Sequence, residues 1–401
     1  MFEPSMGFVA RMEVFFSAVG QYLPNEVQRA NFAAYAVGLG SDAERKSVEP
    51  LAARLWPERA NAAHQALCYF LRETRWDDHA VRRAGAAWAL WAATRGGPVR
   101  GAIIDDTGML KQGKHSVAVQ RQYTGSIGKT ANCQVVVTLS AFTDHDTVPI
   151  EAMLYVPEEW ANDPVRREEA RIPPEVVFQT KPEQAMALLR QAHGDGVPMG
   201  DVIYFDADYG RCRALRQTVT EIGCKYVASV HCSQHIWDTA GVWTKPMTVA
   251  EYAACMKPQQ FRRLSWRESS NGKKLSARFS FFRVFVTEDG REPDRTRDKT
   301  EWLIIEWRDG DTKPQHFTLT TLPANTTKHQ LMHKVKQRWR TERMYEDLKG
   351  EVGFDHFEGR SWPGWHHHVS VAFCVFAMLV AERCVAFPPG TSRATAPRAD
   401  N

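Results

Sequence analysis

The feature that most constrains the fold is a change of hydrophobic periodicity at Gly96-Gly97-Pro98. Before this tripeptide, apolar residues recur at spacings of three and four, as in amphipathic helices. After it, short apolar runs alternate with polar stretches, which is typical of strands joined by turns. Because glycine and proline interrupt regular structure, we expect a helical domain over residues 1–97 and a different architecture beyond it.

The helical spacing is clearest over residues 51–56, 66–71 and 81–91, and Ser41-Asp42 is a candidate helix N-cap. The same region is rich in basic residues: Arg45, Lys46, Arg54, Arg59, Arg72, Arg75, Arg82 and Arg83. Such a set is either an ordinary solvated helical face or part of a DNA-binding bundle, and the sequence leaves both open.

Residues 98–230 have the pattern of a mixed α/β sheet. Three strand-like runs come first, and an alternation of helix and strand follows them. The expected strands are 102–106, 133–139, 148–156, 202–205 and 226–230. The expected helices are 182–192 and one that passes through Leu215 and Val219 to a C-cap at Gly223. Between the first two strands, residues 120–129 favour a hairpin.

The remainder divides into three parts. Residues 231–322 read as a β-rich antiparallel insertion, with strands at 279–286 and 302–307. Helical spacing resumes in residues 323–386, where the apolar run Val369–Ala381 is shorter than the about 20 residues that cross a bilayer. We therefore expect a buried helix in a soluble protein, followed by a disordered tail over 387–401.

Acidic residues follow two of the expected strands. Asp105-Asp106 ends the first, and Asp206 is the first acid after 202–205. Functional groups in open α/β sheets lie at the carboxyl ends of strands, and only one of two successive strand residues faces a given site. Either acid taken alone is also explained as an aspartate that caps a turn or helix.

A third acid lies in a basic segment that we expect to be one helix over residues 334–349. At 3.6 residues per turn, Arg338, Glu342 and Lys349 would share one stripe of this helix. Taken alone, the stripe is better explained as a surface ladder of ion pairs, each stabilising a helix by about 0.2–0.5 kcal/mol.

Several motifs occur together in one order: Asp105-Asp-Thr-Gly108, Arg121-Gln-Tyr-Thr-Gly-Ser126, Leu154–Trp160, Phe205-Asp-Ala-Asp-Tyr-Gly210, His356–Trp362 and Gly364–His368. With the arrangement Asp106, Asp206 and Glu342, this order resembles the DDE transposases of insertion sequences. Within the insertion sequence 4-like superfamily, it is most similar to the insertion sequence 701 branch. The resemblance extends from about residue 40 to residue 385.

The resemblance implies an RNase H-like catalytic core that a β-rich insertion interrupts before the last acid. With such a core, we interpret residues 1–97 as a helical DNA-binding domain. It implies that Asp106, Asp206 and Glu342 are the catalytic and metal-binding residues, converging on one pocket. Two Mg²⁺ or Mn²⁺ ions would be the cofactors, since oxygen ligands suit them and a pair of ions can serve both the attacking and the leaving oxygen.

The family's Tyr-Arg-Glu-Lys signature maps onto Arg338, Glu342 and Lys349, but Val335 stands at the tyrosine position. Tyr345, elsewhere on the helix, is not a simple substitute. We expect the basic residues around the acids to contact DNA phosphates: Arg338, Lys349, Lys334, Arg340, Arg121 and Lys129. Lys336 and Arg343 add to the basic character of the segment.

The implied function is binding of the element's terminal inverted repeats in double-stranded DNA, cleavage at its ends, and joining of the 3′-hydroxyl ends to target DNA. Holding two ends together implies a homodimer on DNA. One alternative is a domesticated or inactive DNA-binding derivative. A second is a metal-dependent phosphatase that uses Asp206 and Asp208, although such a motif needs no distant acidic helix.

Three further alternatives concern single motifs. Asp105 is an alternative to Asp106 as ligand. His231-Cys232-Ser-Gln-His235 invites a zinc hypothesis, but no second ligand pair lies nearby, which favours a loop. His366-His367-His368 either contacts phosphate or begins the buried helix, and the second role is favoured.

Composition agrees with this interpretation without requiring it. The 51 Lys and Arg residues against 47 Asp and Glu give a net charge of +4, and 43% of the chain is hydrophobic, which excludes a disordered or collagen-like chain. Eight cysteines without a CxxC pair indicate reduced thiols. We therefore expect a cytoplasmic bacterial protein without a membrane partner, associated with the nucleoid when bound to DNA.

Overall fold

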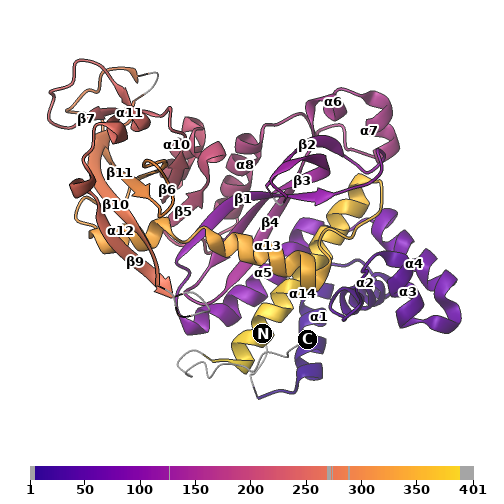
Figure 1. Cartoon of the computed structure of the whole chain (residues 1–401). Helices are drawn as coiled ribbons and strands as arrows, with labels where there is room; N and C mark the ends of the chain where they lie inside the picture. Colours follow the sequence, from indigo (N-terminus) through magenta and orange to yellow (C-terminus); the bar gives the residue numbers. More distant parts are fainter. Residues whose placement is uncertain (1–4, 126, 269–271, 273, 288–289, 389–401) are drawn as a thin grey trace. The chain divides into compact units, whose positions relative to one another are not determined.

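The computed structural model describes residues 5–125, 127–268, 272, 274–287 and 290–388 (Figure 1). The chain forms two compact units. The first unit comprises residues 1–100, 105–199 and 341–401, and the second comprises 101–104 and 200–340. The two units are groups of residues that contact one another, and they are not functional domains. The domain boundaries expected after residues 97, 230 and 322 therefore stay a prediction.

The first unit begins with the expected helical region: α1 (Phe8–Gly20), α2 (Glu26–Leu39), α3 (Val48–Leu55), α4 (Ala60–Arg72) and α5 (Asp78–Ala93), with 3-10 turns at Pro57–Arg59 and Thr94–Gly96. Gly97 then has φ +143°, a conformation that L side chains rarely adopt, so the helical region ends at the predicted tripeptide. The predicted cap at Ser41-Asp42 is wrong, because α2 ends before it and the Ser41 hydroxyl bonds back to the Gly38 carbonyl oxygen.

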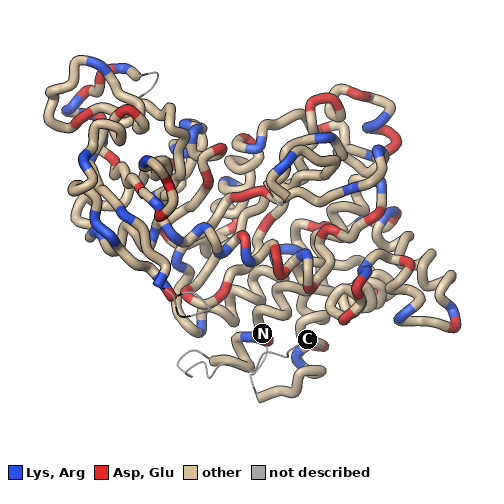
Figure 2. Tube along the Cα trace, in the orientation of Figure 1, with Lys and Arg blue, Asp and Glu red and all other residues tan. Residues whose placement is uncertain are grey.

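Part of the basic set in these helices does not form a DNA-facing surface. Lys46 is 3% exposed and donates to the carbonyl oxygens of Leu39 and Glu351. Arg82 is 6% exposed. Basic and acidic positions are interspersed over these helices (Figure 2). For Lys46 and Arg82, the DNA-binding alternative is therefore wrong.

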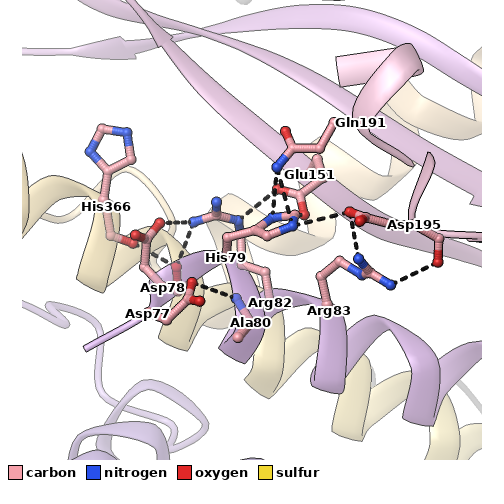
Figure 3. Close-up of polar contacts among 11 residues, drawn as sticks. Asp77, Asp78, His79, Ala80, Arg82, Arg83, Glu151, Gln191, Asp195 and His366 are labelled. Atoms are coloured by element: carbon pink, nitrogen blue, oxygen red, sulfur yellow. Dashed lines mark hydrogen bonds and ion pairs between the residues drawn. The ribbon is translucent and has the colours of Figure 1, made fainter. Parts of the chain in front are cut away.

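Arg82 belongs to a buried polar network that joins α5 to the rest of the first unit (Figure 3). Its Nε donates to Glu151 Oε2 over 3.0 Å, and its Nη1 contacts Asp78 and Ser370. Glu151, which is 1% exposed, also lies 2.6 Å from His79 Nδ1. The network thus compensates the charge of a fully buried carboxylate with two cationic or proton-donating partners.

The remaining elements of the first unit are β2 (Gln120–Thr124), β3 (Lys129–Phe142), β4 (Thr147–Tyr155), α6 (Glu158–Ala161), α7 (Pro164–Ala170), α8 (Lys181–Gly194) and α14 (Trp362–Ala386), with β1 (Gly101–Leu110) shared between the units. β3 bonds to β1, to β2 and to β4, while α8 packs on β3 and β4. The predicted strands and the hairpin are confirmed, although residue 126 lies outside the described residues. The predicted end of the first strand at Asp105-Asp106 is wrong, because β1 continues to Leu110.

Helix α14 contains the predicted apolar run and packs against α2, α4, α5 and β4 (Figure 1). Among the described residues it is the one helix that is long and apolar enough to cross a membrane, and 67% of its most apolar window is buried inside the protein. Burial of this kind is that of a core helix, as the sequence predicted. The predicted disordered tail lies outside the described residues from 389 onward.

The histidines at the start of α14 have structural roles. His367 Nδ1 lies 2.8 Å from the Leu71 carbonyl oxygen, and its ring stacks on Trp76. His368 Nδ1 lies 2.8 Å from the Tyr35 hydroxyl. Burial lowers the pKa of His367 to about 4 and that of His368 to about 3, so both rings are neutral at neutral pH. The structure therefore favours the core role of these two residues.

The second unit contains β5 (Val202–Phe205), β6 (Lys225–Val230), β7 (His235–Asp238), β8 (Met247–Thr248), β9 (Arg262–Glu268), β10 (Lys274–Phe285), β11 (Thr300–Trp307) and β12 (His316–Thr320). Strands β1, β5 and β6 are parallel, and from β12 onward the order β6-β12-β11-β10-β7 is antiparallel. Because β12 bonds directly to β6, the insertion extends the core strands of this unit. The described residues form a mixed sheet of twelve strands.

The helices of the second unit are α9 (Ala207–Gly210), α10 (Arg213–Glu221), α11 (Val249–Ala254) and α12 (Lys328–Val335), with a 3-10 turn at Pro258–Gln260. A Cβ at Gly210 would lie 1.8 Å from the Ser229 carbonyl oxygen, so α9 approaches β6 as only a glycine allows. Gly223, with φ +79°, follows the end of α10 as the sequence predicted.

The predicted continuous helix over residues 334–349 is wrong. Helix α12 ends at Val335, residues 336–338 form a turn, and α13 (Trp339–Val352) begins afterwards. Side chains of the turn make other bonds: Lys336 forms a tertiary pair with Glu306 on β11, and Gln337 Nε2 donates locally to the His333 carbonyl oxygen. Lys336 therefore does not extend a basic DNA track, and Arg338 precedes the helix that carries Glu342.

Candidate active site

Asp106 is the more accessible of the two aspartates on β1. Its side chain is 24% exposed, and Oδ2 lies 3.1 Å from Lys181 Nζ. Asp105 is 7% exposed, and its Oδ1 accepts a bond from the Asp106 backbone N–H. This alternation along the strand favours Asp106 over Asp105 as the acid that faces the site.

Lys181 is a neighbour of Asp106 that the sequence did not indicate. It is the first residue of α8, where Thr180 and Glu183 form a capping box that fixes the start of the helix. Its ammonium also lies 5.9 Å from the centre of the Tyr155 ring. No local motif announces a contact between residues so far apart in the chain. The Lys181 ammonium places a positive charge beside the Asp106 carboxylate, which we predict to bind a metal ion.

Lys349 connects α13 to β1 beside Asp106. Its ammonium donates to Thr107 Oγ1 and to the Gly108 carbonyl oxygen, each over 2.8 Å. Burial lowers the pKa of Lys349. Lys349 is therefore placed next to the first catalytic candidate, while its contact with a DNA phosphate stays a prediction.

Tyr345 connects α13 to strand β3 of the first unit. Its hydroxyl lies 2.5 Å from Thr138 Oγ1 on β3. Burial, with the negative charges of Asp105 and Asp106, raises the pKa of Tyr345 well above its ordinary value. A hydroxyl so engaged does not replace the tyrosine of the family signature, as the sequence indicated.

Glu342 lies in the first turn of α13 and is exposed. The buried stripe of this helix consists of Thr341, Met344, Tyr345, Leu348 and Val352. The neighbouring Arg343 pairs with Asp347 over 2.9 Å and Glu346 over 3.3 Å. Glu342 therefore belongs to the accessible side of a helix whose opposite side is fixed in the core.

Asp206 follows β5 in the second unit and caps α9. Its Oδ1 accepts bonds from the backbone N–H groups of Asp208 and Tyr209, at 3.0 and 3.2 Å. Asp206 is therefore a helix cap, as the sequence allowed. The two bonds fix its carboxylate at the carboxyl end of β5, which pairs in parallel with β1. Ile103 of β1 is opposite Tyr204 of β5.

The predicted DNA-binding residues occupy three places. Arg340 Nε donates to Gln337 Oε1 over 2.8 Å, close to the turn that contains Arg338. Lys334 lies in the last turn of α12. Arg121 and Lys129 are exposed positions of the β2–β3 hairpin. DNA contacts by these residues stay predictions.

Comparison with known proteins identifies the family. Residues 18–273 match the model of the DDE superfamily endonucleases. The chain belongs to this superfamily. Residues 180–378 match the model of a transposase DDE domain. The resemblance to DDE transposases and the RNase H-like mixed α/β fold that it implied are thereby confirmed.

A curated relative of this DDE-superfamily chain is the probable transposase for insertion sequence element IS701 of Microchaete diplosiphon, 24% identical over 279 residues. The match covers 67% of the present chain and 64% of the relative. The chain thus spans less than two thirds of that relative's length.

The donor set fits the divalent ions that the family implies, because carboxylate oxygens are their preferred ligands and Lys181 shows that Asp106 attracts a cation. Within the described part of the chain, no group of three or more His, Cys, Asp and Glu side chains is placed to hold a metal ion, so the zinc hypothesis at His231–His235 gains no support. Asp206 belongs to one unit and Asp106 and Glu342 to the other, and their convergence stays a prediction.

Proposed function

We propose that this protein is a transposase that binds the terminal inverted repeats of an insertion sequence, cleaves at its ends and joins the 3′-hydroxyl ends to target DNA. The match of residues 18–273 to the DDE superfamily endonucleases carries this proposal. Three acids support it: Asp106 within strand β1, Asp206 directly after β5, and Glu342 in the first turn of α13.

In the proposed site, Asp106, Asp206 and Glu342 hold two Mg²⁺ or Mn²⁺ ions. When bound, such ions supply activation of the attacking oxygen and stabilisation of the leaving oxygen in phosphoryl transfer. The protein's own contribution is to fix the ligands. Lys349 bonds α13 to the strand segment that follows Asp106, and the N–H groups of α9 orient Asp206.

The proposed partner is double-stranded DNA, both as element ends and as target. Arg338, Lys334, Arg340, Arg121, Lys129 and Lys349 are proposed to hold its phosphates, which position the duplex without reading its sequence. Cutting two ends in one reaction requires two active sites held together, so we propose a homodimer on DNA. The proposed location is the bacterial cytoplasm, at the nucleoid.

The proposal is tested by incubating the full chain with linear DNA that carries the ends of its own element. In Mg²⁺ or Mn²⁺ we expect strand cleavage at the element boundary that leaves a 3′-hydroxyl, followed by joining to a target plasmid. Binding of the ends without any cleavage in either metal would favour the inactive derivative instead. Turnover of a small phosphoester without DNA cleavage would favour the phosphatase.

Lys181 offers a test of the metal site that does not depend on activity. Replacing Lys181 by Gln removes a positive charge 3.1 Å from Asp106, which otherwise repels and competes with a bound dication. We expect Mn²⁺ to bind the variant several-fold more tightly, as measured by electron paramagnetic resonance of free Mn²⁺. The control is Lys225→Gln, whose ammonium lies 3.9 Å from Asp201. Equal Mn²⁺ affinity of Lys181→Gln and the wild type would contradict metal binding at Asp106.

A further inference from the structure

A basic pocket lies at the start of α10 in the second unit, outside the predicted DNA-binding set. Its volume is about 260 Å³, and its described lining contains no Asp or Glu. Six of the lining residues carry the argument: Arg211, Arg213, Arg216, His231, Ser233 and His235. Glu288 and Asp289, which lie between the lining residues Thr287 and Gly290 in sequence, are outside the described residues. The three arginines make the described lining basic.

One wall of the pocket is built by the segment that joins α9 to α10. Arg216 is 6% exposed and donates through Nη1 to the Gly210 carbonyl oxygen. Gly210 lies so close to the Ser229 carbonyl oxygen on β6 that a Cβ at position 210 would clash with this oxygen. The arginine-bearing backbone is therefore held against the sheet of this unit.

A second part of the lining is the loop over residues 231–234 together with His235, the first residue of β7. The Gln234 backbone N–H donates to the His231 carbonyl oxygen over 3.0 Å, and the Val249 N–H donates to the Gln234 carbonyl oxygen over 2.9 Å. The side chains of His231, Ser233 and His235 are exposed at the mouth. Arg216 also interacts with the side chains of Tyr226 and Glu301, so the charges that we assign to a ligand are those of Arg211 and Arg213.

Guanidinium groups stay charged at all physiological pH values and bond phosphate oxygens in pairs. The pocket is also close in the chain to the proposed active site, since α9 alone separates Asp206 at its N-terminal end from Arg211 at its C-terminal end. At 1.5 Å per residue, that separation is roughly one to two helical turns.

We propose that this pocket binds a backbone phosphate of the DNA strand, near the phosphate that is cut at Asp206. The proposal rests on the proposed function, because it assigns one contact of the same DNA. Its ligand chemistry is a phosphate group, and the alternative source is inorganic phosphate or a free nucleotide.

The test is equilibrium binding of a fluorescent element-end duplex in EDTA, where no cleavage occurs. We expect the double variant Arg211→Gln/Arg213→Gln to raise Kd about tenfold and to reduce the slope of log K against log salt by about one. The matched control is Arg297→Gln/Lys299→Gln, which removes two exposed charges of the same unit away from the pocket. Circular dichroism confirms that each variant is folded.

The outcomes separate this proposal from the function it rests on. If the wild type fails to bind element-end DNA, the proposed function is overturned. If the wild type binds and the pocket variant matches the control in Kd and salt slope, the phosphate contact is overturned alone. A pocket variant that loses binding of inorganic phosphate, seen by ³¹P NMR, but keeps full DNA affinity also overturns it, because the pocket then serves a free anion.

Discussion

Replacing Glu342 by Gln is expected to reduce cleavage of element-end DNA by about 10³-fold or more while leaving DNA binding within about twofold. The substitution keeps the shape of the side chain but removes a charged oxygen that we propose as a metal ligand. Glu342 is exposed in the first turn of α13, so its loss leaves the buried stripe of that helix intact. The measurement is the initial rate of strand cleavage in Mg²⁺ on a labelled duplex.

Glu346→Gln is the matched control for this experiment. Glu346 is one turn further along α13, with a side chain 68% exposed and 3.3 Å from Arg343. We expect its cleavage rate to stay within about twofold of the wild type, since an exposed ion pair contributes about 1 kcal/mol or less to stability. Equal cleavage by the Glu342→Gln variant and the wild type would remove Glu342 from the active site.

The second large effect concerns stability. Replacing Arg82 by Met is expected to lower the free energy of unfolding by about 3–5 kcal/mol, because it leaves the carboxylate of Glu151 buried with one partner fewer. Glu151 is 1% exposed and depends on Arg82 Nε and His79 Nδ1 for compensation. The substitution also removes the Arg82 N–H groups that donate hydrogen bonds to Asp78 and to Ser370.

Urea unfolding followed by circular dichroism measures this effect, with Arg83→Met as the control. Arg83 is the next residue of α5, but its side chain is 31% exposed and it pairs with Asp195, whose side chain is 29% exposed, so a loss of about 1 kcal/mol or less is expected. Adding Glu151→Leu to Arg82→Met should recover part of the loss, since the uncompensated charge is gone. Equal stability of the Arg82→Met and Arg83→Met variants would show that the network is not energetically important.

The secondary structure was largely predictable because it depends on local patterns. The change of periodicity at Gly96-Gly97-Pro98 correctly placed the end of the helical region, and the apolar runs placed β1, β3, β5 and β6. The break between α12 and α13 was not predictable from helical spacing. In the turn between them Lys336 contacts Glu306, which is thirty residues earlier and whose proximity the local pattern does not show. Contacts between residues far apart in the chain can override the helix propensity of a segment, and helical spacing does not reveal them.

The same distinction holds for the candidate site. Asp106, Asp206 and Glu342 were indicated by motif order, which is visible in the sequence. The predicted strand end holds for Asp206 but not for Asp106, which lies inside β1. Lys181 was missed, since its contact with Asp106 arises only when α8 packs beside the strands. The basic pocket was missed for a similar reason: its arginines precede the insertion and its histidines begin it, and folding brings them together.

The central claim is that acids from three distant segments bind the same ions. Iron-directed cleavage of the protein tests it directly: Fe²⁺ replaces Mg²⁺, and hydroxyl radicals formed with ascorbate and peroxide cut the backbone near the bound metal. We predict cuts near Asp106, Asp206 and Glu342 together, all suppressed by excess Mg²⁺ and all weakened in Glu342→Gln. Cuts confined to one of these segments, or unaffected by Mg²⁺, would contradict a shared metal site.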